Sequence, residues 1–218
     1  MPGQDLSAAG LVVGVKSIIS RAEARWFDWT RSVNTQVSVT LDGAAIKWDD
    51  AYEYLPSRAA TTRMAINALP IRNYQDYDFI DFGSGKGKVL LIAAEYPFRR
   101  VEGIEFSGEL HKAAAANICT YRSRRRKCFD ITSVNINAID YQFPDDDCVL
   151  YFFNPFGLRT MQGVLRNLAR SLTACPRDVF VILAYPELAP IFRDLPQMKP
   201  VLENRRVAIF RSRLIHSV

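Results

Sequence analysis

Histidine is scarce in this chain, with only His111 and His216 among 218 residues. Four cysteines are present, and they form neither a C-x-x-C pair nor a cluster beside two histidines: Cys119, Cys128, Cys148 and Cys175. Zinc sites draw their ligands from such clusters. We therefore predict that no metal is bound and that the cysteines are free thiols in a reducing, cytoplasmic setting.

Long hydrophobic runs are also lacking. The most apolar early stretch, residues 11–19, is interrupted by Lys16 and is too short to span a bilayer. The overall composition, 49% hydrophobic and 23% charged, is that of an ordinary globular protein. The sequence therefore predicts a protein without a membrane segment, and its net charge of +5 is compatible with an acidic partner.

Short apolar runs and helical patterns alternate from residue 77 onward. Strands are predicted near residues 78–82, 100–105, 131–136, 148–153 and 178–184, with helices over 86–95, 108–121 and 158–172. Such alternation indicates a doubly wound α/β fold whose sheet is mostly parallel. Residues 200–202 and 205–211 are predicted to add an antiparallel hairpin at the edge of the sheet.

Residues 1–70 differ in pattern from the rest of the chain. Helices are predicted over 4–31 and 50–70, with a short strand over 37–41. No linker separates this part from the remainder, so we expect it to pack as a helical cap on a main domain of residues 71–218. Its aromatic residues are expected to anchor the first helix in the core: Trp26, Phe27 and Trp29.

A glycine-rich turn comes after the first predicted strand, at Asp81-Phe82-Gly83-Ser84-Gly85-Lys86-Gly87. Glycine permits positive φ and close approach of a ligand to the backbone, as at nucleoside sites of open α/β sheets. The G-x-G-x-G spacing differs from both the dinucleotide fingerprint and the phosphate loop. A purely structural turn remains the alternative.

An acidic residue ends the second predicted strand, about 20 residues after the glycines. Glu105 can accept hydrogen bonds from both hydroxyls of a ribose, and Phe106 can pack on a purine. Alone, Glu105 would be a solvated strand-end acid. After this glycine turn, the ribose interpretation is favoured.

A second polar feature, Asn154-Pro155-Phe156, comes after the predicted strand 148–153. The Asn side-chain oxygen can accept a hydrogen bond from an attacking amine. Proline fixes the turn, and the aromatic ring can form one side of the pocket for the target group. Asn and Pro are also ordinary turn formers. The position at a strand end favours function.

Together these residues resemble the class I S-adenosylmethionine-dependent methyltransferases, from about residue 50 to the C-terminus. The resemblance implies a seven-stranded Rossmann-like sheet and S-adenosyl-L-methionine as cofactor. It implies that Asp81 supports the turn and the methionine amino group, that Glu105 holds the ribose and that Phe106 lies beside the adenine. The turn itself would lie along the cofactor at Gly83, Ser84, Gly85 and Gly87.

Two further segments are assigned by this resemblance. After the third strand the family often places an acid near the adenine amine, whereas this chain has Ile139 there. Asp140, or the backbone of Asn137 and Ala138, would serve instead. Upstream, Tyr52 in residues 52–58 would form part of a lid over the cofactor. An ordinary helix start is an equal alternative for that segment.

The acceptor is predicted from Asn154, Pro155 and Phe156, the expected catalytic residues, and Asn154 is also expected to contact the cofactor. They resemble the [DN]-P-P-[YF] motif of amine-directed methyltransferases, although one proline is missing. They are closer to the corresponding loop of the non-SET lysine methyltransferases. We therefore predict an N-directed methyltransferase acting on a protein lysine or similar amine. The alternatives are an RNA or DNA methyltransferase and a non-catalytic module that binds the cofactor.

The densest basic run is Arg122-Ser123-Arg124-Arg125-Arg126-Lys127. Such a run is most often a solvated loop. Its functional alternative is contact with an acidic protein surface or a nucleic acid. No ladder of interleaved aromatic residues accompanies it in the sequence, so nucleic acid is only weakly supported as a partner. The sequence does not indicate an oligomeric state.

Overall fold

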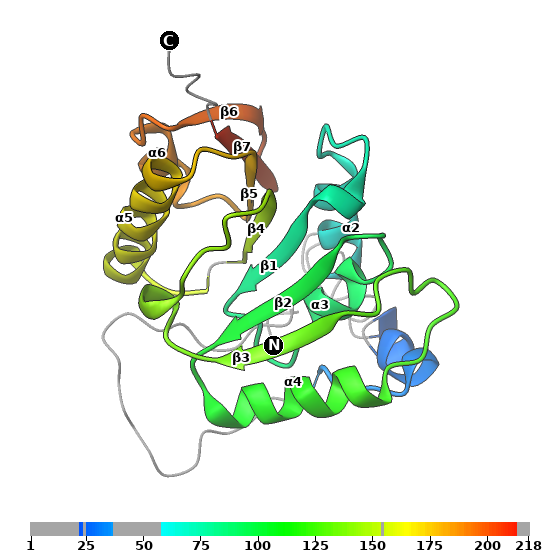
Figure 1. Cartoon of the computed structure of the whole chain (residues 1–218). Coiled ribbons are helices and arrows are strands. Elements are labelled where there is room, and N and C mark those ends of the chain that lie inside the picture. Colours follow the sequence, from blue (N-terminus) through cyan, green and yellow to red (C-terminus); the bar gives the residue numbers. More distant parts are fainter. Residues whose placement is uncertain (1–21, 24, 37–57, 154, 213–218) are drawn as a thin grey trace, which may run out of the picture.

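A computed structural model of the chain describes residues 22–23, 25–36, 58–153 and 155–212. Seven strands form one sheet with helices on both faces (Figure 1). In chain order the elements are α2 (Ala59–Asn67), η1 (Tyr74–Asp76), β1 (Asp78–Phe82), α3 (Lys88–Ala93), β2 (Arg100–Glu105), α4 (Gly108–Thr120), β3 (Ile131–Asn135), η2 (Ala138–Asp140), β4 (Cys148–Phe152), α5 (Leu158–Ala174), β5 (Val179–Ala184), α6 (Ala189–Arg193), β6 (Met198–Glu203) and β7 (Val207–Ser212).

The strand order is β3-β2-β1-β4-β5-β7-β6. Strands β1 to β5 pair in parallel, and β7 is antiparallel to both of its neighbours, β5 and β6. This order and the antiparallel edge confirm the predicted doubly wound, mostly parallel seven-stranded sheet.

The central strands are apolar because both of their faces are covered. Every residue of β1, β4 and β5 is buried, as expected for parallel strands between two helical layers. Successive side chains point to opposite faces, so Phe79 and Tyr151 lie in one hydrophobic cluster, and Ile80 and Leu150 in the other.

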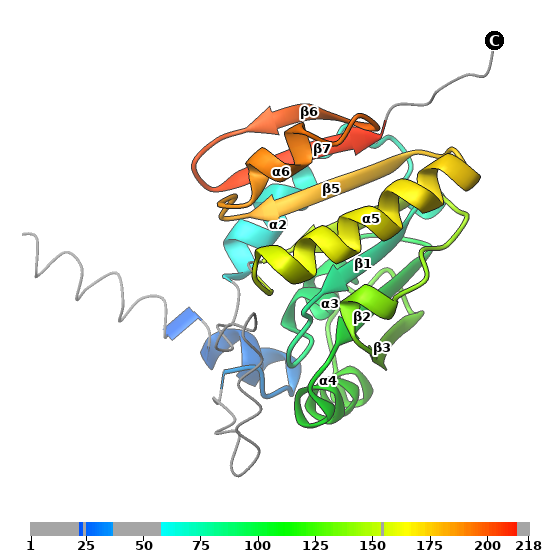
Figure 2. The same cartoon turned by 90° about the vertical axis from the view of Figure 1, so that its left-hand side faces the viewer.

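Helices α2 and α3 cover one face, and α5 and α6 cover the other (Figure 2). The buried residues of α5 recur at helical spacing, which gives the helix one apolar face toward the sheet: Met161, Val164, Leu165, Leu168 and Leu172. Helix α4 packs chiefly against β2 and β3.

The described parts of residues 1–70 share the core of the main sheet. Residues 22–23 and 25–31 are helical, and Phe27 joins Ala65, Ile66 and Leu69 of the α2 region in the cluster that contains Phe79. A boundary at residue 70 stays a prediction, and the predicted strand at 37–41 lies outside the described residues.

The expectation that all three aromatic residues of the first helix enter the core is wrong. Phe27 is 4% exposed, whereas Trp26 is 64% and Trp29 75% exposed. Positions 26 and 29 share the outer face of the helix, because residues three apart are neighbours on a helix surface.

The C-terminal region holds more structure than the sequence predicts. Helix α6 was not predicted, and β6 is longer than residues 200–202. The hairpin tolerates Pro200 because β6 is an edge strand, and the pairing register shifts between Pro200 and Leu202.

The fold places its switch point between β1 and β4. Strands β2 and β3 lie on one side of β1, and the chain then crosses to β4 on the other side. Open α/β sheets bind ligands beyond the carboxyl ends of the strands at such a point. The glycine turn comes directly after β1 and Pro155 comes shortly after β4, so both lie at this edge.

Candidate cofactor and acceptor site

The glycine turn has a backbone that other residues adopt only with strain. Gly83, Gly85 and Gly87 have φ angles of 76°, 53° and 79°, all in the left-handed region. The N–H groups of Gly83 and Ser84 both donate to the Ile104 carbonyl oxygen, at 2.9 and 3.1 Å. These bonds tie the turn to the end of β2.

Glu105, at the end of β2, is hydrogen-bonded to the turn. Its Oε2 accepts a hydrogen bond from the Gly85 N–H at 2.8 Å, and its Oε1 accepts one from the Ser107 N–H at 2.8 Å. The carboxylate is 8% exposed. Burial raises the pKa of Glu105, while these N–H groups act in the opposite direction. A carboxylate has about four acceptor positions, so it can still accept from further hydroxyls.

Asp81 is the other buried acid at this edge and is 2% exposed. In register it lies between Gly103 of β2 and Tyr151 of β4. Among the described residues, Asp81 Oδ2 and Ser84 Oγ have no hydrogen-bond partner. Burial, and then the nearby charge of Glu105, raise the pKa of Asp81 well above its ordinary value.

Buried polar atoms without partners are rare in folded proteins. Here one such atom is the Asp81 carboxylate oxygen, just before the left-handed glycine turn, and another is the Ser84 hydroxyl, inside the turn between Gly83 and Gly85. These groups fit a ligand that has a cationic group to pair with Asp81 and hydroxyls to donate hydrogen bonds to Glu105. S-adenosylmethionine carries both kinds of group.

Gly103 supports the turn and was missed in the sequence. A Cβ at this position would lie 2.7 Å from both Ser84 Oγ and Leu90 Cδ1. Any side chain there would force Ser84 and Leu90 to shift. The available signal was a glycine inside an otherwise β-forming segment, which often marks close approach of another backbone.

The end of β3 joins the same edge beside Glu105 and Phe106. Asn135 donates from Nδ2 to the carbonyl oxygens of Glu105 and Phe106, at 2.9 and 2.8 Å. Phe106 is 50% exposed. Its ring is therefore accessible to a ligand, although its packing on adenine stays a prediction.

The segment predicted to meet the adenine amine forms the start of η2. The Asn137 side chain accepts a hydrogen bond from the Ile139 N–H at 3.1 Å, and Ala138 is buried. Asp140 is exposed. The Asn137 side chain therefore has a local structural partner, and a cofactor role for Asn137 and Ala138 stays a prediction.

Pro155 meets the glycine turn directly. A Cβ on Gly83 would lie 2.4 Å from Pro155 Cβ, so the loops after β1 and β4 touch. Phe156 is 9% exposed and packs edge-on against Phe152, with ring centroids 6.3 Å apart. The ring belongs largely to the core. Asn154 and Tyr52 lie outside the described residues.

Tyr185 follows β5 at the same edge of the sheet and was not singled out in the sequence. It has a φ of 57°, which is unusual for a residue other than glycine, and such backbone outliers cluster at functional sites. Its ring packs edge-on against Phe153 at 5.5 Å. A small pocket lies beside it, lined by Phe152, Pro155, Met161, Leu183, Ala184, Tyr185, Pro186 and Leu188.

Thr62 of α2 and Tyr151 of β4 meet near this edge. Their hydroxyl oxygens are 3.3 Å apart. Burial raises the pKa of Tyr151, and the charges of Asp81 and Tyr185 add to that effect. The hydroxyl contact joins α2 to β4, and Tyr151 lies opposite Asp81 in the register of β4 and β1.

Metal ligands and membrane spans are both absent from the described residues. No group of three or more His, Cys, Asp or Glu residues there is arranged to hold a metal ion. No helix within those ranges is long and apolar enough to cross a membrane.

No protein-family model and no curated protein sequence matches the chain. Solved structures do resemble it. A proposed RNA methyltransferase from Pyrococcus horikoshii is 13% identical, with 91% of this chain and 98% of that chain covered and a TM-score of 0.56. A 23S rRNA methyltransferase is 14% identical, with 74% and 70% covered and a TM-score of 0.50.

A third structure, a predicted N6-adenine-specific DNA methylase from Listeria monocytogenes, is 15% identical to the chain. The match covers 79% of this chain and 53% of that one, with a TM-score of 0.51. Sequence identities this low show a shared fold and do not show a shared function. The strand order, the glycine turn at the switch point and these likenesses agree: the chain has the fold of the class I S-adenosylmethionine-dependent methyltransferases.

Proposed function

We propose that the protein is an S-adenosylmethionine-dependent methyltransferase acting on a nitrogen of a nucleic-acid base. The observation that carries the cofactor assignment is the pair of buried acids at the switch point. Glu105 holds the Gly85 N–H at 2.8 Å, and Asp81 Oδ2 has no partner among the described residues.

Each residue at this edge has a proposed task. Glu105 accepts hydrogen bonds from the ribose hydroxyls, Asp81 faces the positively charged amino-acid end, and Phe106 packs on the adenine. The turn at residues 83–87 brings backbone alongside the ligand. When bound, S-adenosylmethionine supplies a methyl group activated by a sulfonium.

The chain then has only to position the acceptor, because the reaction needs no protein nucleophile. Pro155 and Tyr185 bound the small apolar pocket at the ends of β4 and β5. We place a planar base beside this pocket. The Asn154 side-chain oxygen would accept a hydrogen bond from the amine, which aims the nitrogen lone pair at the methyl carbon.

Three considerations support a nucleic-acid acceptor over the protein lysine predicted from residues 154–156. The similar structures with TM-scores of at least 0.50 are described as RNA, 23S rRNA and DNA methyltransferases. The chain has a net charge of +5. Arginines and a lysine are exposed together after α4. A protein amine remains the second candidate, and a non-catalytic cofactor-binding module the third.

The test uses the full chain with a methyl-labelled cofactor and three acceptor pools: RNA, single-stranded DNA and protein. We expect label in nucleic acid that survives protease and is lost on nuclease treatment. Label that survives nuclease and is lost on protease treatment would show that the acceptor is a protein instead. Cofactor binding without label in any pool would favour the non-catalytic module.

Asn154→Ala tests the acceptor position separately from the cofactor. We expect binding of S-adenosylhomocysteine within about twofold of the wild type and loss of transfer by about 100-fold or more, a typical cost of removing one positioning group. Asn73→Ala, an exposed residue beside η1, is the matched control and should keep full activity. Full activity in Asn154→Ala would overturn the placement.

A further inference from the structure

One surface combines exposed aromatic rings with a concentration of positive charge. We call it the Trp–Arg surface. It comprises residues of the first helix and of the segment between α4 and β3: Arg25, Trp26, Trp29, Arg122, Arg124, Arg125, Lys127 and Phe129. All eight are exposed. Trp26, Trp29 and Phe129 are 64%, 75% and 74% exposed, the highest values among the large apolar residues described.

The two segments of this surface are joined, although about 90 residues separate them in the chain. The Arg122 N–H donates to the Arg31 carbonyl oxygen at 3.1 Å. Asn34 and Asn117 exchange two hydrogen bonds, of 2.8 and 3.1 Å. Figure 1 shows the first helix beside the loop at the end of α4.

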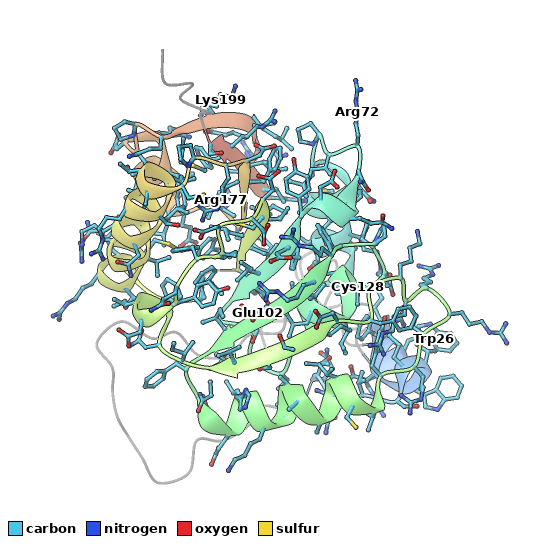
Figure 3. All side chains as sticks on the ribbon, viewed as in Figure 1. Trp26, Arg72, Glu102, Cys128, Arg177 and Lys199 are labelled. Carbon is cyan, nitrogen blue, oxygen red and sulfur yellow. The ribbon has the colours of Figure 1, made fainter. Side chains whose placement is uncertain are left out.

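The opposite face of the first helix fixes it to the protein. Phe27 is buried, and the Arg31 guanidinium lies 4.3 Å from its ring centroid. Arg31 also pairs with the largely buried Glu95 at 2.9 Å. The helix is therefore held without Trp26 or Trp29, and Figure 3 shows Trp26 at the outer edge of the molecule.

The two tryptophans lie together rather than as scattered apolar groups. Their ring centroids are 5.4 Å apart and their planes are tilted by 48°. Exposed apolar clusters rimmed by polar residues commonly mark interaction sites. In the loop, the Arg126 guanidinium lies over the Phe129 ring at 4.9 Å, which adds a second flat surface.

The charge of the surface fits a polyanion. Five basic residues are exposed on it: Arg25, Arg122, Arg124, Arg125 and Lys127. The same two segments hold three acids, Glu23, Asp28 and Asp130. Arginines bind phosphate through a planar fork, and aromatic rings stack on unpaired bases. A double helix hides its base faces, so rings of this kind suit a single strand.

We propose that the Trp–Arg surface binds single-stranded nucleic acid, with bases on Trp26 and Trp29 and phosphates along Arg122 to Lys127. It lies toward the amino ends of the strands, since β3 begins two residues after Phe129, whereas the glycine turn lies at the carboxyl end of β1. A five-residue strand spans about 16 Å. The surface therefore holds the single-stranded nucleic acid and takes no part in the methyl transfer. As a docking site for the acceptor, it rests on the proposed function.

Fluorescence anisotropy with labelled single-stranded RNA and DNA oligonucleotides tests this surface. The variants are Trp26→Ala/Trp29→Ala and Arg124→Ala/Arg125→Ala in the full chain. The control, Arg72→Ala/Lys199→Ala, also removes two positive charges, at exposed positions that Figure 3 places at the other end of the molecule. Equal unfolding midpoints would establish that all of the variants are folded.

We expect the tryptophan variant to lose at least about tenfold in affinity, because stacking stabilises each bound base substantially. The double arginine variant should bind more weakly at low salt, with a salt slope smaller by about 1.4. The control should change less than about threefold. Equal losses in the control, or wild-type binding by the tryptophan variant, would overturn the proposal. So would tight binding to anionic vesicles with no binding to either oligonucleotide.

Methyl transfer to the same oligonucleotides separates the two proposals. Tryptophan-dependent binding without methyl transfer would contradict the proposed function but support the docking surface. Methyl transfer with an unchanged KM in the tryptophan variant would contradict the docking surface but support the proposed function. A KM raised about tenfold with unchanged kcat supports both.

Discussion

The two candidate binding regions of this molecule differ in which side chains they bury and which they expose to solvent. At the carboxyl ends of the strands, Asp81 and Glu105 are acids that are 2% and 8% exposed. On the Trp–Arg surface, Trp26 and Trp29 are apolar rings left in solvent. Each region departs from what folding alone favours, in opposite directions.

The two regions are suited to different kinds of ligand. A desolvated acid beside positive-φ glycines suits a small ligand with a cationic group and hydroxyls, because few contacts in low dielectric are strong. An exposed basic and aromatic surface suits a long polyanion, because many weak contacts add along its length. Substitutions in one region should leave the other unchanged.

The largest expected effect is at the turn. Gly85→Arg places a side chain at a residue with φ of 53°, beside the buried Glu105, so cofactor binding should be abolished. The assay is titration calorimetry with S-adenosylhomocysteine. Gly108→Ala, where a Cβ has only ordinary contacts, should bind normally. Binding by Gly85→Arg would place the cofactor elsewhere.

The next contrast concerns the two faces of the first helix. Phe27→Ala removes a ring that is 4% exposed and should lower the free energy of unfolding by about 3 kcal/mol. Trp29→Ala removes a ring that is 75% exposed and should change it by about 0.5 kcal/mol or less. Urea denaturation measures both, and similar losses would mean that Trp29 packs on the protein.

Glu105→Gln should weaken cofactor binding by about 10- to 100-fold, as expected for hydrogen bonds to a charged group. The amide keeps one acceptor oxygen for Gly85 or Ser107 but loses the charge. Glu102→Gln on the same strand is the control, since Glu102 instead accepts a hydrogen bond from Tyr141. Equal losses in the two variants would show a general effect on β2.

The smallest predicted effect is a pH dependence of opposite sign for stability and binding. Burial, and then Glu105, raise the pKa of Asp81. The ligand-free fold therefore favours the protonated acid, and that stability is lost as pH rises from the ordinary value of 3.8 through the raised pKa. Affinity for the cationic ligand end should rise over the same range, as the carboxylate forms.

Asp81→Asn removes this titration. At neutral pH the variant should melt higher than the wild type without ligand, yet bind S-adenosylhomocysteine more weakly and with little pH dependence. Thermal melts and calorimetry at several pH values measure both. An unchanged pH profile of binding would mean that Asp81 does not face the cationic group.

The fold could be predicted from the sequence because its central strands are continuously apolar and its glycines mark a turn. Phe79 to Phe82 and Val149 to Phe152 indicate two buried parallel strands without ambiguity. Helix α6 is five residues long and has too few turns for a periodic signal. Helix α3 begins at Lys88 rather than residue 86, because Gly87 is still left-handed.

The site could be predicted only where residue type alone sets the role. Asp81 and Glu105 stand at strand ends, and the strand order brings them together. Tyr185 and Gly103 were missed because a positive φ at a tyrosine and a close contact with Ser84 depend on tertiary packing. The exposure of Trp26 and Trp29 was likewise missed, because rings at positions 26, 27 and 29 lie on both faces of a helix and do not show which of those faces is buried.

Cofactor binding at the glycine turn is the first claim to test, since the proposed methyl transfer to any acceptor depends on it. Titration calorimetry of the full chain with S-adenosylhomocysteine tests it, with NADH as the comparison ligand. We predict one bound S-adenosylhomocysteine per chain, lost in Gly85→Arg, and no binding of NADH. Binding of NADH without binding of S-adenosylhomocysteine would contradict the claim.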